Sequence, residues 1–262
     1  MASAHKARKR FGQNFLTDQN IIQKIIRSIH PQSADNLVEI GPGQGALTAP
    51  LLSSCQTLTA IEIDRDLIQI LLQKFQQTAL NVVEADALSY DFAQLITSPN
   101  QLRIVGNLPY NISTPLLFHL LKFVSGIKDM HFMLQKEVIE RICAQPNNKA
   151  YGRLSVMIQC YCEVENCFLV PPEAFNPKPK VTSAIIRLKP KNFKHSIEQQ
   201  NFFSNIVKLS FSQRRKTLKN NLKTHFATQI AGIDDIDFSL RPEQLSVADY
   251  LNLAAQLSPI KD

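Results

Sequence analysis

The chain has 262 residues, of which 44% are hydrophobic and 19% charged, a composition typical of an ordinary globular protein. No stretch reaches the roughly 18 to 20 uninterrupted apolar residues of a membrane span, and the basic N-terminus is not followed by the apolar core of an export signal. We therefore expect a cytoplasmic protein with no membrane partner.

The net charge of +7 is distributed unevenly along the chain. Residues 1–16, 171–194 and 206–224 hold 16 of the 29 basic residues but only one of the 22 acidic residues, which leaves 13 bases against 21 acids elsewhere. An acidic body with three basic segments favours binding of a phosphate backbone on one surface. Solvated basic loops scattered over the surface are the alternative.

The five cysteines give no reason to expect a metal site. Their number is odd, and their spacing fits neither a disulfide framework nor a zinc set. Reduced thiols are the expectation for a cytoplasmic chain.

The first predicted elements lead to a glycine-rich loop. After a basic arm over residues 1–16, Thr17 is a plausible N-cap of a helix whose isoleucines recur at helical spacing until Pro31. A strand over 37–40 then runs into Gly41-Pro42-Gly43-Gln44-Gly45 and a helix start at Ala46-Leu47-Thr48. Such glycines let the backbone approach a ligand and aim helix amides at it, although this spacing alone is a weak signal.

Three further predicted strands bring polar residues to their ends. These strands cover residues 58–63, 81–85 and 102–106. Glu62 lies 21 positions after Gly41, where a carboxylate can bind the two ribose hydroxyls of a nucleoside. Asp86 can accept a hydrogen bond from an adenine amino group, and Asn107 ends the last of these strands. Open α/β sheets bind ligands at the carboxyl ends of their strands, so a nucleoside site is predicted there. A dinucleotide enzyme is the alternative, although no Arg or Lys stands beside the glycine loop in the sequence.

We assign the chemistry to Asn107-Leu108-Pro109-Tyr110. The Asn107 amide oxygen and the Leu108 carbonyl can accept hydrogen bonds from an exocyclic NH2. Pro109 has no competing N–H and fixes the backbone, and Tyr110 can stack on an aromatic base. An adenine amino nitrogen is a poor nucleophile because its lone pair is delocalised, so two preorganised acceptors would favour a pyramidal nitrogen and stabilise the charge that develops during alkyl transfer. The alternative is a simple turn with a half-buried Tyr.

A proline-rich loop follows several alternating elements. The pattern predicts a helix over 116–123, a strand over 130–134 in which His131 packs rather than reacts, a helix over 138–143, and a helix end with two strands within 156–170 and 183–188. Four prolines keep the loop at residues 171–181 extended and stiff. It can present Phe175 as a second stacking face opposite Tyr110, with Lys178 and Lys180 toward phosphate. The alternative is a connector with Phe175 in the core.

The C-terminal pattern is helical from Ser196 onward. One apolar stripe lies around Phe203, and a second helix over 211–222 places Leu218 and Leu222 on one face and basic residues on the rest. Residues 241–246 open a final short helix. We therefore predict a small α-helical second domain over 193–262.

The motifs taken together closely resemble one known family. They are Gly12-Gln13-Asn14-Phe15-Leu16, Glu39-Ile40-Gly41-Pro42-Gly43, Ile61-Glu62-Ile63-Asp64, Asp86-Ala87, Gly106-Asn107-Leu108-Pro109-Tyr110-Asn111-Ile112-Ser113, Phe175-x-Pro-x-Pro-Lys-Val-x-Ser183 and Arg214-Arg215-Lys216. In residues and order, over nearly the whole chain, they resemble the KsgA/RsmA family of rRNA adenine N6,N6-dimethyltransferases.

The resemblance implies an α/β fold, with a Rossmann-like seven-stranded S-adenosylmethionine-dependent methyltransferase domain over 17–192 and a helical RNA-recognition domain over 193–262. It implies transfer of two methyl groups from S-adenosylmethionine to N6 of each of two adjacent adenosines in the 3′-terminal hairpin loop of 16S rRNA. The partner would be the immature small ribosomal subunit, and the enzyme would act as a monomer.

The implied site has two parts and no metal. The donor-binding part comprises Asn14, Leu16, Gly41, Gly43, Glu62, Asp86 and Asn107. The catalytic part comprises Asn107, Leu108, Pro109, Tyr110 and Phe175. Gln44 stands where an apolar residue is expected in many relatives, which bears on the fine geometry of donor binding.

Three rival functions remain open at the level of the sequence. Macrolide-resistance enzymes share the fold and chemistry but modify large-subunit rRNA; the runs at 214–218 and 241–244 look like the small-subunit group. DNA N6-adenine methyltransferases carry a second Pro where Leu108 stands. A non-catalytic assembly factor would bind the immature subunit through its basic face, and the intact motif at 107–110 argues against pure scaffolding.

Overall fold

The computed structural model describes residues 13–192 and 196–257. Most of the predicted basic arm, at residues 1–12, lies outside this range. The described chain divides into two compact units. The first unit comprises residues 13–139 and 163–190, and the second comprises 140–162, 191–192 and 196–257.

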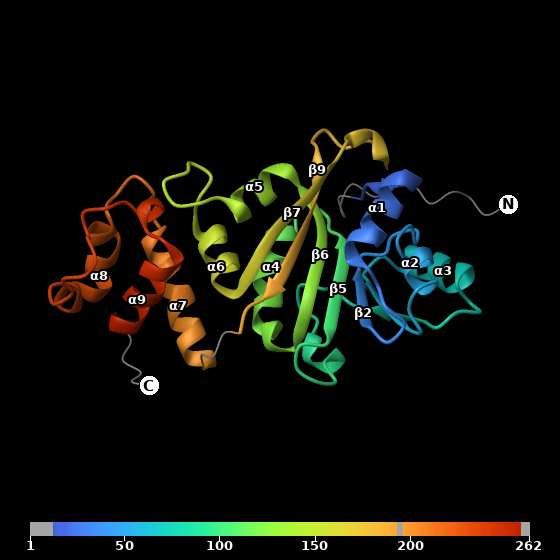
Figure 1. Cartoon of the computed structure of the whole chain (residues 1–262), viewed down its shortest axis with the longest axis horizontal. Helices are drawn as coiled ribbons and strands as arrows, with labels where there is room; N and C mark the ends of the chain where they lie inside the picture. The colour runs from blue at the N-terminus through green and yellow to red at the C-terminus, as the bar shows by residue number, and fades with distance from the viewer. Residues whose placement is uncertain (1–12, 193–195, 258–262) are drawn as a thin grey trace. The chain divides into compact units, whose positions relative to one another are not determined.

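The first unit is built on a seven-stranded sheet in the order β4-β3-β2-β5-β6-β9-β7 (Figure 1). Its strands are β2 (Asn36–Ile40), β3 (Leu58–Glu62), β4 (Leu80–Glu84), β5 (Leu102–Asn107), β6 (Ile127–Gln135), β7 (Cys162–Val170) and β9 (Ser183–Pro190). Strands β4, β3, β2, β5 and β6 run parallel, and β9 runs antiparallel to β6. The predicted seven-stranded fold and the predicted strand positions are confirmed.

Short helices connect these strands. They are α1 (Gln19–Ile29), α2 (Thr48–Leu52), α3 (Arg65–Lys74), η2 (Phe92–Leu95), α4 (Ser113–Leu120), η3 (Leu121–Gly126) and η4 (Pro172–Ala174), with α5 (Lys136–Cys143) running from the first unit into the second. A separate two-stranded sheet pairs β1 (Phe15–Leu16) with β8 (Phe175–Asn176). The loop at 171–181 therefore contains a helical turn and a paired strand, where an extended stretch was predicted.

Strand β5 is mostly apolar, because the sheet is covered on both faces. Val105 belongs to the core cluster into which α1 buries Ile22 and Ile25. Its neighbour Ile104 points to the opposite face and is also fully buried. His131 on β6 is buried as well, in agreement with the predicted packing role, and burial lowers its pKa to about 4.

Helix α1 begins one residue later than predicted. Asp18, not Thr17, is the N-cap, and its carboxylate accepts hydrogen bonds from the backbone N–H groups of Asn20 and Ile21. Thr17 is engaged elsewhere, since both its N–H and its hydroxyl donate to the carbonyl of Ala174. A long-range contact therefore decides between two residues that both favour caps.

The second unit is helical. Its helices are α6 (Arg153–Tyr161), α7 (Ile197–Ser210), α8 (Leu218–Ile230), η5 (Pro242–Gln244) and α9 (Val247–Leu257). Residues 140–162, predicted within the first domain, belong to this unit because α6 packs on α7, with the rings of Tyr161 and Phe203 6.4 Å apart. Among the described residues, no helix is long and apolar enough to cross a membrane.

The helix predicted over 211–222 is wrong in its first half. Residues 211–216 form turns, and α8 begins at Leu218 after the N-cap Thr217. The buried amide of Asn221 stabilises these turns by donating to the carbonyls of Ser210 and Gln213. Leu218 and Leu222 are both buried, as predicted.

Candidate functional site

The carboxyl ends of β2, β3, β4 and β5 meet at a cavity of about 480 Å3. Its lining includes ten of the predicted site residues: Asn14, Leu16, Gly41, Gly43, Glu62, Asp86, Asn107, Leu108, Pro109 and Tyr110. Parallel strands present their carboxyl ends at one edge of a sheet, so residues distant in the sequence converge there. The volume suits a ligand of nucleoside size.

The glycine-rich loop lines one wall of this cavity. Gly41 and Gly43 have φ values of 65° and 58°, a region that side chains disfavour. A Cβ atom on Gly43 would lie 3.2 Å from the Phe15 ring, so the loop and β1 are in close contact. Helix α2 begins at Thr48, after turns, within the helix start predicted at Ala46-Leu47-Thr48.

Glu62 is a buried carboxylate held in a fixed orientation at the end of β3. Its Oε1 accepts hydrogen bonds from the N–H groups of Ile63 and Asp64, at 2.9 and 3.0 Å, and its Oε2 accepts one from Gly43 at 3.4 Å. Burial raises its pKa, which these three hydrogen bonds partly offset. The side chain is therefore preorganised to accept two hydroxyl groups, as a ribose would offer.

A second buried acid lies next to this wall. Glu39 on β2 is 2% exposed and accepts a hydrogen bond from the hydroxyl of Thr48 at 2.6 Å. Burial raises the pKa of Glu39 to about 7, and the charge of Glu62 contributes to the rise.

Asp86 stands at the end of β4, on the exposed rim of the cavity. Its Oδ1 accepts a hydrogen bond from the N–H of Leu88 at 2.9 Å. This bond fixes the carboxylate at the strand end, where it can accept from an adenine amino group.

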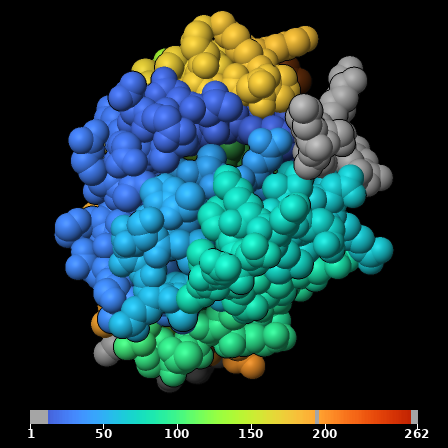
Figure 2. Space-filling model, turned by 90° about the vertical axis from the view of Figure 1, so that its right-hand side faces the viewer, coloured from blue at the N-terminus to red at the C-terminus, as the bar shows by residue number. Residues whose placement is uncertain are grey.

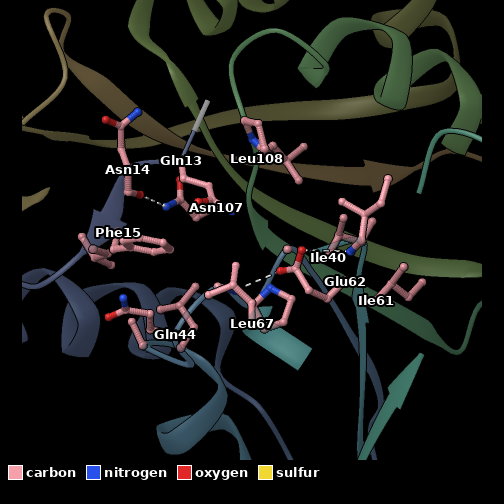
Figure 3. Close-up of a pocket in the computed structure, with 18 of the residues that line it drawn as sticks. Gln13, Asn14, Phe15, Ile40, Gln44, Ile61, Glu62, Leu67, Asn107 and Leu108 are labelled. Atoms are coloured by element: carbon pink, nitrogen blue, oxygen red, sulfur yellow. Dashed lines mark hydrogen bonds between the residues drawn. The ribbon is translucent and has the colours of Figure 1, made fainter. Parts of the chain in front are cut away.

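Asn107 ends β5 with its amide held in one orientation. Its Nδ2 donates to the main-chain carbonyl of Asn14 at 3.0 Å, and Figure 3 shows that carbonyl facing Asn107 while the Asn14 side chain extends away. Because the NH2 group is used in this way, Oδ1 is the atom left to accept from a ligand. Leu108 follows, with its N–H donating to Met133.

Tyr110 is half-buried and its orientation is fixed at the phenol end. Its hydroxyl lies 2.7 Å from the Ser183 hydroxyl, and burial raises its pKa. The ring lines the cavity together with Pro109. The turn that formed the alternative interpretation is present, since the Ile112 N–H donates to the Pro109 carbonyl, and it supports the exposed edge of the site.

Phe175 is the predicted site residue that does not line the cavity. It is 5% exposed and packs in the core cluster with Leu16 and Ile22, because β8 pairs with β1. Figure 2 shows the gold segment that contains β8 lying against the blue N-terminal segment. The structure therefore has the buried arrangement considered as the alternative, and a catalytic role for Phe175, which would need the ring to leave this core, stays a prediction.

Two residues that line the cavity, Gln13 and Lys74, were not predicted as site residues, nor was Asp64, which Gln13 contacts. Gln13 donates its side-chain amide to Asp64 at 3.0 Å, and Lys74 donates its ammonium to the Gln44 carbonyl at 3.0 Å. Lys74 thus supplies the basic group that the sequence lacks beside the glycine loop. Gln13 and Asp64 both stand inside recognised motifs, which was the available signal; Lys74 had none.

These residues fit a nucleoside donor with a positive charge. Glu62 and Asp86 provide oxygen acceptors at two strand ends, and the glycines leave room for close approach of a ligand. Asn107 adds its side-chain Oδ1 as a further acceptor, and apolar residues such as Ile61 and Leu67 also line the cavity. Residues that could hold a sulfonium nucleoside are therefore present and oriented.

Comparison with known proteins agrees with this geometry. A family model described as ribosomal RNA adenine dimethylase matches residues 4–258. Proteins named ribosomal RNA small subunit methyltransferase A are 55% identical in Saccharophagus degradans and 56% identical in Legionella pneumophila. These alignments cover 97% of this chain and 96% and 99% of the two relatives.

Two solved structures are also similar over most of their length. A dimethyladenosine transferase from Plasmodium falciparum has a TM-score of 0.75 and 27% identity, with 91% of this chain and 95% of that chain covered. The 23S rRNA methyltransferase ErmE has a TM-score of 0.65 and 26% identity, with 93% and 99% covered.

Proposed function

The chain belongs to the ribosomal RNA adenine dimethylase family, and we propose that it dimethylates N6 of two adjacent adenosines in the 3′-terminal hairpin loop of 16S rRNA. It is an S-adenosylmethionine-dependent rRNA adenine methyltransferase. The identity of 55% to 56% with small-subunit enzymes supports this substrate. The proposed partner is the immature small subunit, and the enzyme acts on it as a cytoplasmic monomer. Loop adenosines suit the reaction because an unpaired base is easily extruded.

The donor-binding residues are those at the strand ends. Glu62 would accept the ribose hydroxyls, Asp86 would accept from the adenine amino group, and the glycine loop would face the amino-acid part. When bound, S-adenosylmethionine supplies an electrophilic methyl group on a sulfonium. The backbone of residues 14–16 and Asn107 would close the cavity from the target side.

Asn107 and Leu108 act on the target adenosine. The Asn107 Oδ1 and the Leu108 carbonyl accept the two hydrogens of the target amino group, which favours a pyramidal nitrogen with an available lone pair. The same two oxygens stabilise the positive charge that develops on nitrogen. A proton is then lost to solvent. The observation that carries this proposal is the hydrogen bond from Asn107 Nδ2 to Asn14, since it leaves Oδ1 as the acceptor.

Tyr110 would hold the base by stacking. The contact between its hydroxyl and Ser183 keeps the ring in place without using its faces. Such stacking on an aromatic ring tolerates every base, so specificity for adenine rests on the amino-group acceptors.

The helical unit would recognise the rRNA. Arg215 and Lys216 are exposed in the turns before α8, in reach of a phosphate backbone. Arg214 has a structural role instead, because its guanidinium donates hydrogen bonds to the carbonyls of Lys149 and Tyr151 within the same unit.

Replacement of Asn107 tests this proposal. We expect Asn107→Ala to lose dimethylation of unmethylated small subunits while its donor affinity falls only modestly, and the control Asn81→Ala, an exposed Asn on β4, to retain activity. Mass spectrometry of rRNA after reaction with labelled donor gives both the extent and the position of methylation. Retained dimethylation by Asn107→Ala would remove the role assigned to this residue.

The same assay with both ribosomal subunits present separates the rival functions. Label in large-subunit rRNA would favour the macrolide-resistance type. The similarity to the 23S rRNA methyltransferase ErmE is the reason to test this alternative. No label in any rRNA, together with rescue of subunit maturation by Asn107→Ala, would favour a scaffold.

A further inference from the structure

Residues 13–16 form a strap that crosses the strand ends of the donor cavity. At one end, the Gln13 amide donates to the Asp64 carboxylate, just after β3. In the middle, the Phe15 ring covers the Gly43 backbone. The strap also accepts, through the Asn14 carbonyl, the hydrogen bond from Asn107 at the end of β5. Figure 3 shows these strap residues above the labelled Glu62 and Gln44.

Asp64 is a rigid anchor for this strap. It is 1% exposed, and its Oδ1 caps α3 by accepting from the N–H of Asp66. Its own N–H donates to Glu62, so the anchor belongs to the same rigid turn as the proposed ribose carboxylate. The other carboxylate oxygen, Oδ2, accepts from Gln13.

The Asn14 carbonyl, next to Gln13 in the strap, controls the orientation of an atom on which the reaction depends. An Asn side chain can turn its amide by half a rotation, which exchanges Oδ1 for an NH2 group. For Asn107, the Asn14 carbonyl opposes this exchange because it would then face an oxygen. An NH2 group turned toward the target amine would repel it.

We infer that Gln13 is a positioning residue, which anchors the strap to Asp64 so that the Asn14 carbonyl keeps Asn107 Oδ1 directed at the target amine. This inference rests on the role proposed above for Asn107. It assigns to Gln13 and Asp64 a part in turnover, separate from contact with the rRNA.

Exchange of the two polar groups tests the inference directly. Gln13→Glu places two carboxylates against each other, and we expect turnover at saturating donor and rRNA to fall by about tenfold to one hundredfold, as for a lost hydrogen bond to a charged group. Asp64→Asn should stay within about threefold of the original chain, because Gln13 can turn its amide to accept and Asn also caps helices well.

The double variant Gln13→Glu with Asp64→Asn restores the hydrogen bond with donor and acceptor reversed. We expect it to return to within about threefold of the original turnover, which a general loss of structure would not do. Gln13→Ala, which removes the bond without adding charge, should lose activity in the same direction. The control Gln23→Glu makes the same charge change at an exposed position on α1 and should leave turnover unchanged.

The readouts are dimethyladenosine formed in unmethylated small subunits, donor affinity by calorimetry, and thermal unfolding by circular dichroism. Turnover by Gln13→Glu equal to the original chain would overturn the inference, and so would failure of the double variant to recover. If the unaltered chain itself leaves the rRNA unmodified, the proposed function fails instead, so the two failures are distinguishable.

Discussion

Replacing Glu39 with glutamine should stabilise the protein, and more so at high pH. Glu39 is buried, and its carboxylate accepts a hydrogen bond from the hydroxyl of Thr48. In the folded protein, burial raises its pKa to about 7, against an ordinary value of 4.5. The folded state therefore binds a proton that the unfolded chain releases, and stability is lost as pH rises from about 4.5 through about 7.

The size of the effect follows from this difference in pKa. At about 1.4 kcal/mol per pH unit, the ionisation of Glu39 destabilises the folded state by about 3 kcal/mol at pH 8. At pH 5 most of this penalty is absent, and less than about 1 kcal/mol remains. Glu39→Gln removes the ionisation but can still accept from Thr48, so the variant should gain these amounts.

Urea unfolding at pH 5 and pH 8, followed by circular dichroism, measures this gain. The chain has no tryptophan whose fluorescence could report on this region. Hydrogen exchange of a peptide that contains β2 and α2 therefore measures the local stability. Glu137→Gln, at an exposed position on α5, is the matched control. An equal stability change at the two pH values would refute the reasoning, since the effect would then not come from a titrating group.

Two further predictions concern buried polar groups. Arg103→Met should destabilise the first unit by about 3 to 5 kcal/mol, because Asp35 and Asp129 lose their buried partner and keep only the more exposed Lys128 and Arg187, at 3.3 and 3.8 Å. Urea unfolding measures this loss, and the exposed Arg65→Met should change stability little. Asn221→Ala should cost about 1 to 3 kcal/mol by removing the side-chain donor to the Ser210 carbonyl and one of two donors to the Gln213 carbonyl, which also accepts from the N–H of Lys216. Unchanged hydrogen exchange in residues 210–222 would contradict the second prediction.

The parts of the fold that could be predicted are those that follow from neighbouring residues in the sequence or from the order of the strands. Strand β5 could be predicted from its apolar run. A strand that is covered on both faces is apolar throughout, and from Leu102 to Val105 the single polar residue is Arg103, which is paired with Asp129. Glu62, Asp86 and Asn107 could be placed together from the sequence because parallel topology fixes where strand ends lie. No contact between distant residues was needed for either inference.

Two of the errors come from contacts between residues distant in the sequence. Thr17 favours an N-cap as strongly as Asp18 does, and only the carbonyl of Ala174 decides between them. The position of Phe175 depends on the pairing of β8 with β1, which joins segments 160 residues apart: Phe15 is paired with Asn176, and Leu16 with Phe175. Hydrophobic spacing cannot show such pairing, because an aromatic residue serves equally well in a core and on a stacking face.

The pairing of β1 with β8 has a consequence for how the target side of the site is organised. The strap that fixes Asn107 includes β1, and β8 is part of the loop that carries the basic residues Lys178 and Lys180. If binding of a phosphate backbone moves this loop, β8 therefore moves β1 with it. The position of the Asn14 carbonyl then changes as well. If Phe175 leaves the core to reach a base, Leu16 loses a packing partner and the strap loses part of its support. The orientation of Asn107 and the position of Phe175 are thus mechanically coupled, and substitutions at Phe175 should alter turnover even without contact between its ring and the base.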